Sequence, residues 1–401
     1  MFYTTPSTPG FRKSATAIAV GAALATVIPG AFAEGLALEE VKVTAQKREQ
    51  SINDVPMSIT AFSSQQMDQM GIDTTADLAV VVPGLNFSDT AFGPPVYTLR
   101  GVGFNESSAQ ATSTVGVYLD EIAIPFPIMT KGVMIDTERV EVLKGPQGTL
   151  YGRNATAGAI NYIAAKPTEE FTAGFKGSYG RYETASGEVF VSGPITDSLR
   201  ARLATKVINS NEGWQESPEV GDDLGEQDKL AARLSVEWDV ADTTDLRFTI
   251  GYNKDESDSL APKNLFWNQR ETDPVAAVFD ATPANVYPND DDDATTASWT
   301  ADRSPSVDHE NTSFALHLNH ELSDTLTLTA LTGYSEFDDS GSEYERGGLG
   351  GITFGEVRDI DPAWLKGKDK DLPDSTMTTM DYVYQEGNID SFSQEIRISQ
   401  T

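Results

Sequence analysis

The sequence has 401 residues, enough for two or three ordinary domains, and it contains no cysteine and three histidines. These counts exclude a disulfide framework and a thiolate metal site, and they leave too few imidazoles for histidine-rich metal chemistry. With 29 basic and 61 acidic residues the formal net charge is -32, so binding to a polyanion such as nucleic acid is not expected.

The first 33 residues have the pattern of an export signal. Arg12 and Lys13 precede an apolar run at residues 14–28, and Pro-Gly-Ala-Phe-Ala closes the segment. The run is too short to span about 30 Å of hydrocarbon, and the proline and glycine break it. We therefore predict a signal peptide over residues 1–33 that is cleaved after Ala33.

Residues 34–167 contain short apolar runs broken by glycine and proline, which is typical of a small α+β domain with many loops. Ser63 is a good N-cap, so a helix is predicted to follow it, with a second helix soon after. The predicted helices cover residues 63–70 and 74–80, and the predicted strands cover residues 96–99, 115–119 and 140–143.

Two glycine-rich stretches in this domain invite comparison with nucleotide-binding loops. Residues 100–103 lack the third glycine of a dinucleotide fingerprint, and residues 145–152 lack the Gly-Lys-Ser/Thr ending of a phosphate loop. We predict tight turns instead, built on Gly101, Gly103, Gly145, Pro146, Gly148 and Gly152. Because no set of nucleophile, base and acid accompanies them, an enzyme is not expected.

From residue 171 onward apolar and polar residues alternate with a period of two. Leu234 and Trp238, for example, share one face of a predicted strand, whereas Arg233 and Ser235 share the other. Strands with one apolar face suit the wall of a lipid-facing barrel, and aromatic residues at their ends suit its interfacial girdles. The eight predicted strands are 171–179, 186–193, 199–209, 229–240, 245–253, 313–322, 325–336 and 391–400; the girdle candidates are Tyr179, Tyr182, Trp214, Trp238, Tyr252 and Tyr334.

The connections between these strands alternate between short and long. Short turns at residues 194–198, 241–244 and 323–324 contrast with long connections at 211–228, 254–311 and 337–390. A soluble β-sandwich also alternates, but it rarely tolerates such loops, so a barrel is favoured. The acidic runs Asp222–Glu226, Asp290–Asp293 and Asp338–Glu345 are expected to be solvated loops, and His317 is expected to fill the polar lumen without binding a metal.

Several segments resemble a known family. Residues 39–49 and 54–62 closely resemble the beginning of proteobacterial TonB-dependent receptors, and residues 138–161 resemble the plug signature of that family almost throughout. Shorter resemblances lie at residues 78–87, 97–103 and 117–121. Two positions depart from the family pattern, because Glu121 stands where glycine is usual and Lys144 where arginine is common. The resemblance extends from residue 39 to about residue 400.

This resemblance implies an architecture and a set of site residues. It implies a periplasmic tail at residues 34–50, an α+β plug domain at 51–167 and antiparallel transmembrane barrel strands at 168–401. Arg100 and Arg139 match arginines that pair with barrel glutamates and lock the plug. The TonB box, a segment that adds as a strand to the protein TonB, matches Glu39, Glu40, Val41, Lys42, Val43, Thr44 and Ala45.

The function implied by the resemblance is TonB-dependent transport across the outer membrane of a Gram-negative bacterium, with a ferric siderophore as the favoured cargo. The partners implied are TonB, outer-membrane lipid and an iron–siderophore ligand, with no cofactor. Cobalamin, haem, saccharides and aromatic compounds are alternative cargoes, and a soluble periplasmic plug-like binder is an alternative of another class. Because eight strands fall short of the about 22 that enclose a plug, we expect an N-terminal fragment that does not transport alone.

Overall fold

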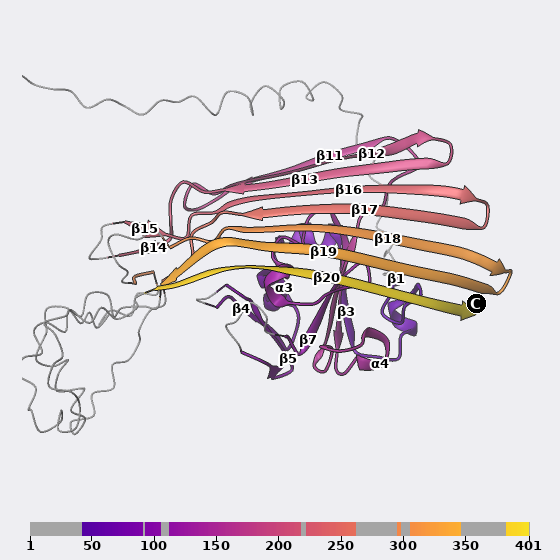
Figure 1. Ribbon diagram of the computed structural model, residues 1–401, viewed down its shortest axis with the longest axis horizontal. Coiled ribbons are helices and arrows are strands. Elements are labelled where there is room, and N and C mark those ends of the chain that lie inside the picture. The colour runs from indigo at the N-terminus through magenta and orange to yellow at the C-terminus, as the bar shows by residue number, and fades with distance from the viewer. Residues whose placement is uncertain are drawn as a thin grey trace, which may run out of the picture. The chain divides into compact units, whose positions relative to one another are not determined.

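The structure, a computed structural model, describes residues 42–90, 93–105, 112–217, 222–261, 295–297, 305–345 and 382–400 (Figure 1). The predicted signal peptide, the first three residues of the predicted TonB box and the acidic run Asp290–Asp293 lie outside these ranges. Two parts follow one another along the described chain. We call the first, an α+β domain, the plug, and the second, a single antiparallel sheet, the wall.

The plug is built on a five-stranded mixed sheet in the order β3-β9-β10-β7-β8. The strands are β3 (Ile59–Ser63), β7 (Val115–Leu119), β8 (Ile122–Ile124), β9 (Thr137–Lys144) and β10 (Gly158–Ala164). All seven residues of β10 are buried because the strand lies between β9, its antiparallel neighbour, and β7, its parallel neighbour. Its sequence, apolar except for the buried Asn161, has no period-two alternation, which explains why the sequence pattern did not predict this strand.

Two helices begin where the sequence predicts them. Helix α2 (Ser64–Met70) is capped by Ser63 and helix α3 (Thr75–Val81) by Thr74, each in a capping box that satisfies otherwise unpaired backbone N–H groups. The helices bury Met67 and Leu78 in the plug core. Two short 3-10 helices, η1 (Ile52–Asp54) and η2 (Pro127–Thr130), complete this part of the plug.

The second glycine-rich stretch differs from its prediction. Instead of tight turns alone, it contains a single turn of helix, α4 (Gly148–Tyr151), in which the Tyr151 N–H donates to the Gln147 carbonyl. The flanking glycines do occupy left-handed turns, with φ 108° at Gly145 and 77° at Gly152. The helix forms because Tyr151 is buried and its carbonyl accepts a hydrogen bond of 2.5 Å from the Tyr118 hydroxyl.

Two smaller sheets flank the plug core. One comprises β4 (Leu85–Ser88), β5 (Val96–Leu99) and β6 (Val102–Gly103), and the other pairs β1 (Lys42–Val43) with β2 (Gln50–Ser51). Within the described ranges, no helix has the length and apolarity that crossing a membrane requires.

The wall contains eight consecutive antiparallel strands, as predicted, and the sheet is not closed (Figure 1). Three short turns join neighbouring strands at one end, where β20 also ends, whereas the short connection from β11 to β12 lies at the other end, among the long connections. The strands are β11 (Thr172–Tyr179), β12 (Ala185–Thr196), β13 (Leu199–Asn209), β16 (Asp228–Ala241), β17 (Thr244–Asp255), β18 (His309–Ser323), β19 (Leu326–Glu345) and β20 (Tyr382–Gln400). A small pair, β14 (Gln215–Glu216) and β15 (Asp223–Leu224), lies in one long connection.

The two faces of the wall differ as the alternation predicts. In β16, Leu234 and Trp238 are exposed, whereas Arg233 and Ser235 are buried. The acidic run Asp338–Glu345, predicted to be a loop, is instead the end of β19. It is ordered as strand because Asp339 is buried and accepts hydrogen bonds from the Ser342 hydroxyl at 2.6 Å and the Gln385 amide at 2.8 Å. Part of the run Asp222–Glu226 likewise forms β15.

Candidate functional site

The N-terminal segment of the described chain is folded against the plug rather than extended away from it. Residues 42–51 turn back on themselves through the β1–β2 pair, with Val43 opposite Gln50. Val43 and Ala45 are fully buried and pack with Tyr118, Leu143 and Tyr151. The sequence suggests a tail here, but burying these two apolar side chains favours docking. Lys42–Ala45, the described part of the predicted TonB box, is therefore in contact with the plug.

Glu141 is the polar anchor for this docked segment. The Thr44 N–H donates to Glu141 Oε1 at 2.8 Å, and the Thr44 hydroxyl donates to the same oxygen at 3.2 Å. Arg139, two residues earlier on β9, donates to it at 2.9 Å. Burial raises the pKa of the Glu141 carboxyl, although the bonds from Thr44 and Arg139 oppose that shift. Glu141 is not among the residues predicted from the sequence, although an acid between the apolar residues Val140 and Val142, two positions after Arg139, was a signal of a buried partner.

The two arginines of the predicted lock make contacts inside the plug. Arg100, in a left-handed conformation with φ 53°, donates to the Ser58 hydroxyl at 2.8 Å and to the Lys144 carbonyl at 3.5 Å. Arg139 forms an ion pair with Glu138 in addition to its bond to Glu141. Within the described ranges, the hydrogen bonds and ion pairs of both guanidinium groups go to plug residues. The lock to barrel glutamates therefore stays a prediction.

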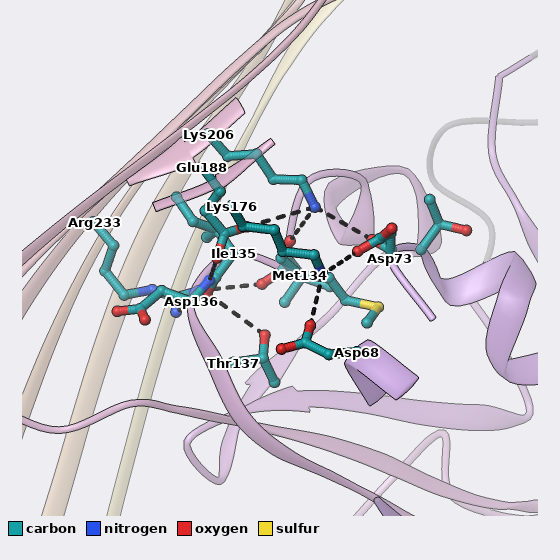
Figure 2. A network of polar contacts seen from close by, with 12 residues as sticks. Asp68, Asp73, Met134, Ile135, Asp136, Thr137, Lys176, Glu188, Lys206 and Arg233 are labelled. Atoms are coloured by element: carbon teal, nitrogen blue, oxygen red, sulfur yellow. Dashed lines mark hydrogen bonds and ion pairs between the residues drawn. The ribbon is translucent and has the colours of Figure 1, made fainter. Parts of the chain in front are cut away.

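A different set of ionic contacts joins the plug to the wall (Figure 2). Arg202 of β13 donates to both carboxylate oxygens of Asp136, each at 2.5 Å, and both side chains are less than a tenth exposed. Asp136 has φ 45°, and its N–H donates to Glu188 of β12 at 3.1 Å. Lys176 of β11 lies 2.7 Å from Asp68 and 2.6 Å from Asp73. Inward-facing wall cations thus meet acids of the plug.

Backbone groups of the plug also accept hydrogen bonds from the wall. Arg233 donates to the Ile135 carbonyl at 2.7 Å and to the Val133 carbonyl at 3.1 Å (Figure 2). The sequence analysis placed Arg233 on the polar face of its strand but not in this contact. A positive charge on an inward strand face, where little water is available, is the signal that could have suggested a partner.

One backbone contact is especially close. The Asn253 side chain of β17 donates to the Lys131 carbonyl at 2.7 Å, beside Gly132. Gly132 has φ 76°, and a Cβ at this position would lie 2.2 Å from Asn253 Oδ1. Both the backbone conformation and the lack of space therefore require glycine here.

His317 faces the plug, as its predicted inward orientation requires. Its Nε2 lies 3.0 Å from the Asp120 carbonyl oxygen, and the ring is buried. Arg247 of β17 lies 3.9 Å from the Asp120 carboxylate. Burial alone would raise the pKa of Asp120, but Arg247 and the neighbouring cations lower it on balance. Among the described residues, no group of three or more His, Asp or Glu side chains is arranged to hold a metal ion.

Several cavities lie between plug and wall in the described part of the chain, including one of about 380 Å³ beside Asp68 and Arg202. Two others lie near opposite ends of the strands. The larger of these two, about 370 Å³, is near the end with long connections, and the smaller, about 170 Å³, is near the end with short turns. The larger is lined by charged and aromatic side chains that include Asp73, Tyr97, Lys131, Lys206, Trp214 and Lys229. Trp214, predicted to belong to an interfacial girdle, therefore contributes to this cavity. Thr44 and Arg139 line the smaller one.

Comparison with known proteins identifies the family. Residues 51–159 match the family model described as the TonB-dependent receptor plug domain. These residues therefore form a plug domain of the TonB-dependent receptors. The eight strands that follow the plug of this receptor are accordingly part of its β-barrel. The recognition and the fold class expected from the sequence are thereby confirmed.

Individual relatives cover part of the chain. The receptor is 32% identical to the pesticin receptor of Yersinia enterocolitica over 52% of this chain and 31% of that protein. It is 35% identical to the vitamin B12 transporter BtuB of Vibrio vulnificus over 38% of this chain and 25% of that one. The chain thus spans about a third or less of these curated relatives.

A solved structure shows the same fold. The ferripyoverdine receptor of the Pseudomonas aeruginosa outer membrane, bound to ferripyoverdine, aligns with a TM-score of 0.60 at 19% identity. The alignment covers 78% of this receptor and 38% of that chain. At this identity the likeness concerns the fold alone.

Proposed function

We propose that this chain is part of a receptor for TonB-dependent uptake of a scarce nutrient across the outer membrane, with a ferric siderophore as the cargo. The observation that carries the proposal is the separation of two features along the strands. The larger cavity lies towards the long connections, whereas the docked N-terminal segment lies near the short turns. A transporter driven from the periplasm needs a cargo site and a coupling segment on opposite sides of its plug.

The lining of the larger cavity is polar and partly aromatic, as a metal chelate requires. Lys131, Lys206 and Lys229 line it together with three aspartates, and Tyr97 and Trp214 supply aromatic surface. Lysine ammonium groups attract carboxylate, catecholate or hydroxamate oxygens, and aromatic rings pack against flat ligand groups. Acids in the same lining, including Asp73, leave the cavity able to accept hydrogen bonds from the ligand as well.

The names of relatives favour the same cargo class and one alternative. The pyoverdine receptors and the ferric yersiniabactin uptake receptor bind or import iron chelates by their names. The vitamin B12 transporter makes cobalamin the second candidate, because it matches this chain at 35% identity over 38% of its length. Uptake assays with separately labelled compounds distinguish the two cargoes.

We propose that the successive segments of the chain have different roles. Residues 1–33 direct export, residues 34–50 carry the TonB box, residues 51–167 form the plug, and residues 168–401 supply the first part of the barrel. Coupling begins when Lys42–Ala45 leave the plug and residues 39–45 add as a strand to TonB by backbone hydrogen bonding. The bonds from Thr44 to Glu141 would break in that step.

The test compares two substitutions at one position of the TonB box. Val41→Pro removes a backbone N–H that strand addition requires, whereas Val41→Ala keeps it. Each variant is expressed from the native gene in its own outer membrane, and uptake of radiolabelled ferric siderophores and labelled cobalamin is measured. Val41→Pro should abolish energised uptake and leave surface binding intact, while Val41→Ala should retain both.

The outcomes separate the candidates. Uptake of a ferric siderophore that survives Val41→Pro would contradict TonB coupling through this segment. Energised uptake of cobalamin with no uptake of any ferric chelate would replace the proposed cargo and leave the coupling intact. Binding without uptake in the unmodified receptor would favour the plug-like binding module.

A further inference from the structure

Lys47 lies two residues after Ala45, and groups of the N-terminal segment, the plug and the wall contact it. Its N–H donates to the Thr44 carbonyl at 2.8 Å, in a left-handed conformation with φ 60°. Its ammonium group lies over the ring of Tyr151, 4.7 Å from the centroid, and 5.9 Å from that of Tyr118. The side chain is 7% exposed although it carries a full charge. A charge so enclosed requires anionic partners.

Glu121 of the plug is the first partner. Its carboxylate lies 3.7 Å from Lys47 Nζ and 2.7 Å from Arg397 Nη1 of wall strand β20. The residue sits in a tight turn with φ 69°, after Asp120 with φ 49°. Glycine would adopt this conformation without strain, so the side chain is retained against a conformational cost. Its two ion pairs supply the compensating interaction.

Glu395 of β20 closes the cluster. It lies 3.4 Å from Lys47 Nζ and 3.0 Å from Arg397 Nη1 through its two carboxylate oxygens. The four charges, Lys47, Glu121, Arg397 and Glu395, therefore alternate in sign around a ring. This ring joins three parts of the molecule, namely the N-terminal segment, the plug turn at residues 120–121 and the wall. We call it the three-part cluster.

We propose that Lys47 is a positioning residue for energy coupling, which ties the segment after the TonB box to the plug turn and to the wall at once. The role in coupling rests on the proposed function, whereas the tethering itself does not. A pull on residues 39–45 then reaches the turn at Asp120–Glu121 and strand β20 through one ammonium group. Release of Lys47 frees the segment from the wall and leaves the strained turn with fewer partners.

Apolar packing alone would give a different behaviour. Val43 and Ala45 slide out of their pocket gradually because hydrophobic contact has no preferred direction. The ion pairs of the three-part cluster instead break after a small displacement of Lys47, since the energy of charged hydrogen bonds and ion pairs depends steeply on separation in a confined lumen. The cluster therefore sets a threshold below which small displacements of the tail do not disturb the plug.

The tethering can be measured without cargo or TonB. Because the chain contains no cysteine, Lys42→Cys gives a single site for a nitroxide spin label on an exposed side chain. The fraction of mobile label is recorded for the receptor in its own outer membrane. Lys47→Met keeps the length of the side chain over the tyrosine rings and removes its charge. We expect it to raise the mobile fraction at least twofold, while Lys47→Arg should stay near the unmodified value.

Further variants test whether the three-part cluster is what restricts the motion of the label. Lys144→Met removes a plug lysine for which the described residues show no side-chain ion pair, and it should not change the mobile fraction. Glu395→Gln changes a residue of the wall alone, and it should also raise the mobile fraction of the label. Combining Lys47→Met with Glu121→Gln should loosen it no more than Lys47→Met does, because both act through one contact.

An unchanged mobile fraction in Lys47→Met, or an equal increase in Lys144→Met, would overturn the proposal. If Lys47→Met prevents insertion, the decision falls to Glu395→Gln, which leaves the plug sequence intact. Absence of transport in the unmodified receptor would contradict the proposed function without affecting the label measurement.

Discussion

At the scale of single residues, Glu141 shows how one buried acid can hold a segment in place. Its Oε1 accepts hydrogen bonds from Thr44 and Arg139, whereas Oε2 has no hydrogen-bond partner within the described part of the chain. Burial with an incomplete set of partners is the cause of its raised pKa. Such a carboxylate accepts a firm hydrogen bond from the Thr44 N–H, but the cost of burying its charge offsets much of the docking free energy that the bond contributes. This balance suits the contact that the proposed coupling step breaks.

The Thr44 amide offers a direct test of this anchor. Glu141→Ala leaves the Thr44 N–H without its acceptor, which should cost about 1–3 kcal/mol of docking free energy. Hydrogen exchange of the Thr44 amide should accelerate about tenfold or more. Glu141→Gln retains a side-chain oxygen and should accelerate exchange less. Equal exchange rates in the unmodified receptor and Glu141→Ala would show that apolar packing alone holds the segment.

At this scale the sequence predicted some residues better than others. Ser63 as a helix cap and Gly145 as a turn residue follow from backbone rules that act locally, and the structure confirms both. Asp136 could not be predicted, because its importance depends on Arg202, 66 positions away in the chain. Residues 39–41 lie outside the described ranges, so the beginning of the predicted TonB box stays a prediction.

At the scale of elements, the plug and the wall meet through strand faces of opposite character. β13 and β16 direct arginines inward, and the loop before β9 presents an aspartate and two carbonyl groups to them. The ion pair of Arg202 with Asp136 joins two side chains that are each less than a tenth exposed, and Arg202 also stacks over Phe190, 3.9 Å from the ring centroid. Removing either Arg202 or Asp136 would leave the other side chain charged and buried, with no water to solvate it.

A double-mutant cycle measures this pair. Arg202→Met leaves Asp136 uncompensated and should destabilise the association of plug and wall by about 3–5 kcal/mol. Adding Asp136→Asn should recover much of that loss, since the remaining charge is removed. Arg200→Met is the matched control, because Arg200 pairs with Glu237 and Asp239 inside the wall. Chemical denaturation of the inserted receptor gives the free energies, and additive losses in the double variant would contradict direct coupling.

The sequence predicted wall elements more fully than plug elements. Period-two alternation continues over eight strands, so their number was evident, although β19 and β20 extend beyond their predicted ends. Polar residues such as Asp339 continue these strands because partners within the fold satisfy them. In the plug, β10 is apolar except for the buried Asn161, and such a short run does not distinguish strand from buried helix.

At the scale of the whole molecule, the scarce positive charges are concentrated where plug and wall meet. A chain with net charge -32 places Arg202, Arg233, Arg247 and Arg397 on the inner face of the wall, each beside an acid or carbonyl of the plug. The outer face is apolar by contrast, with exposed side chains such as Leu234, Phe248 and Leu316. The two faces therefore suit different surroundings, lipid outside and a charged domain inside.

The apolar character of the outer face leads to a quantitative prediction about membrane insertion. Leu234 lies at the middle of β16, so Leu234→Arg should place a charge near the centre of the bilayer and cost about 2–4 kcal/mol. Leu234→Val keeps the surface apolar and should cost much less. Folding of the receptor into lipid vesicles across a urea series gives both values. Equal stabilities for Leu234→Arg and Leu234→Val would show that this face does not contact lipid.

The close approach of Gly132 to Asn253 restricts how the two positions can evolve. A φ of 76° strains any other residue at position 132, and a Cβ there would lie 2.2 Å from Asn253 Oδ1. The Asn253 side chain, in turn, supplies the hydrogen bond to the Lys131 carbonyl. Across a lineage of such receptors, glycine at 132 should therefore persist even where a smaller residue replaces Asn253, because the backbone conformation alone demands it.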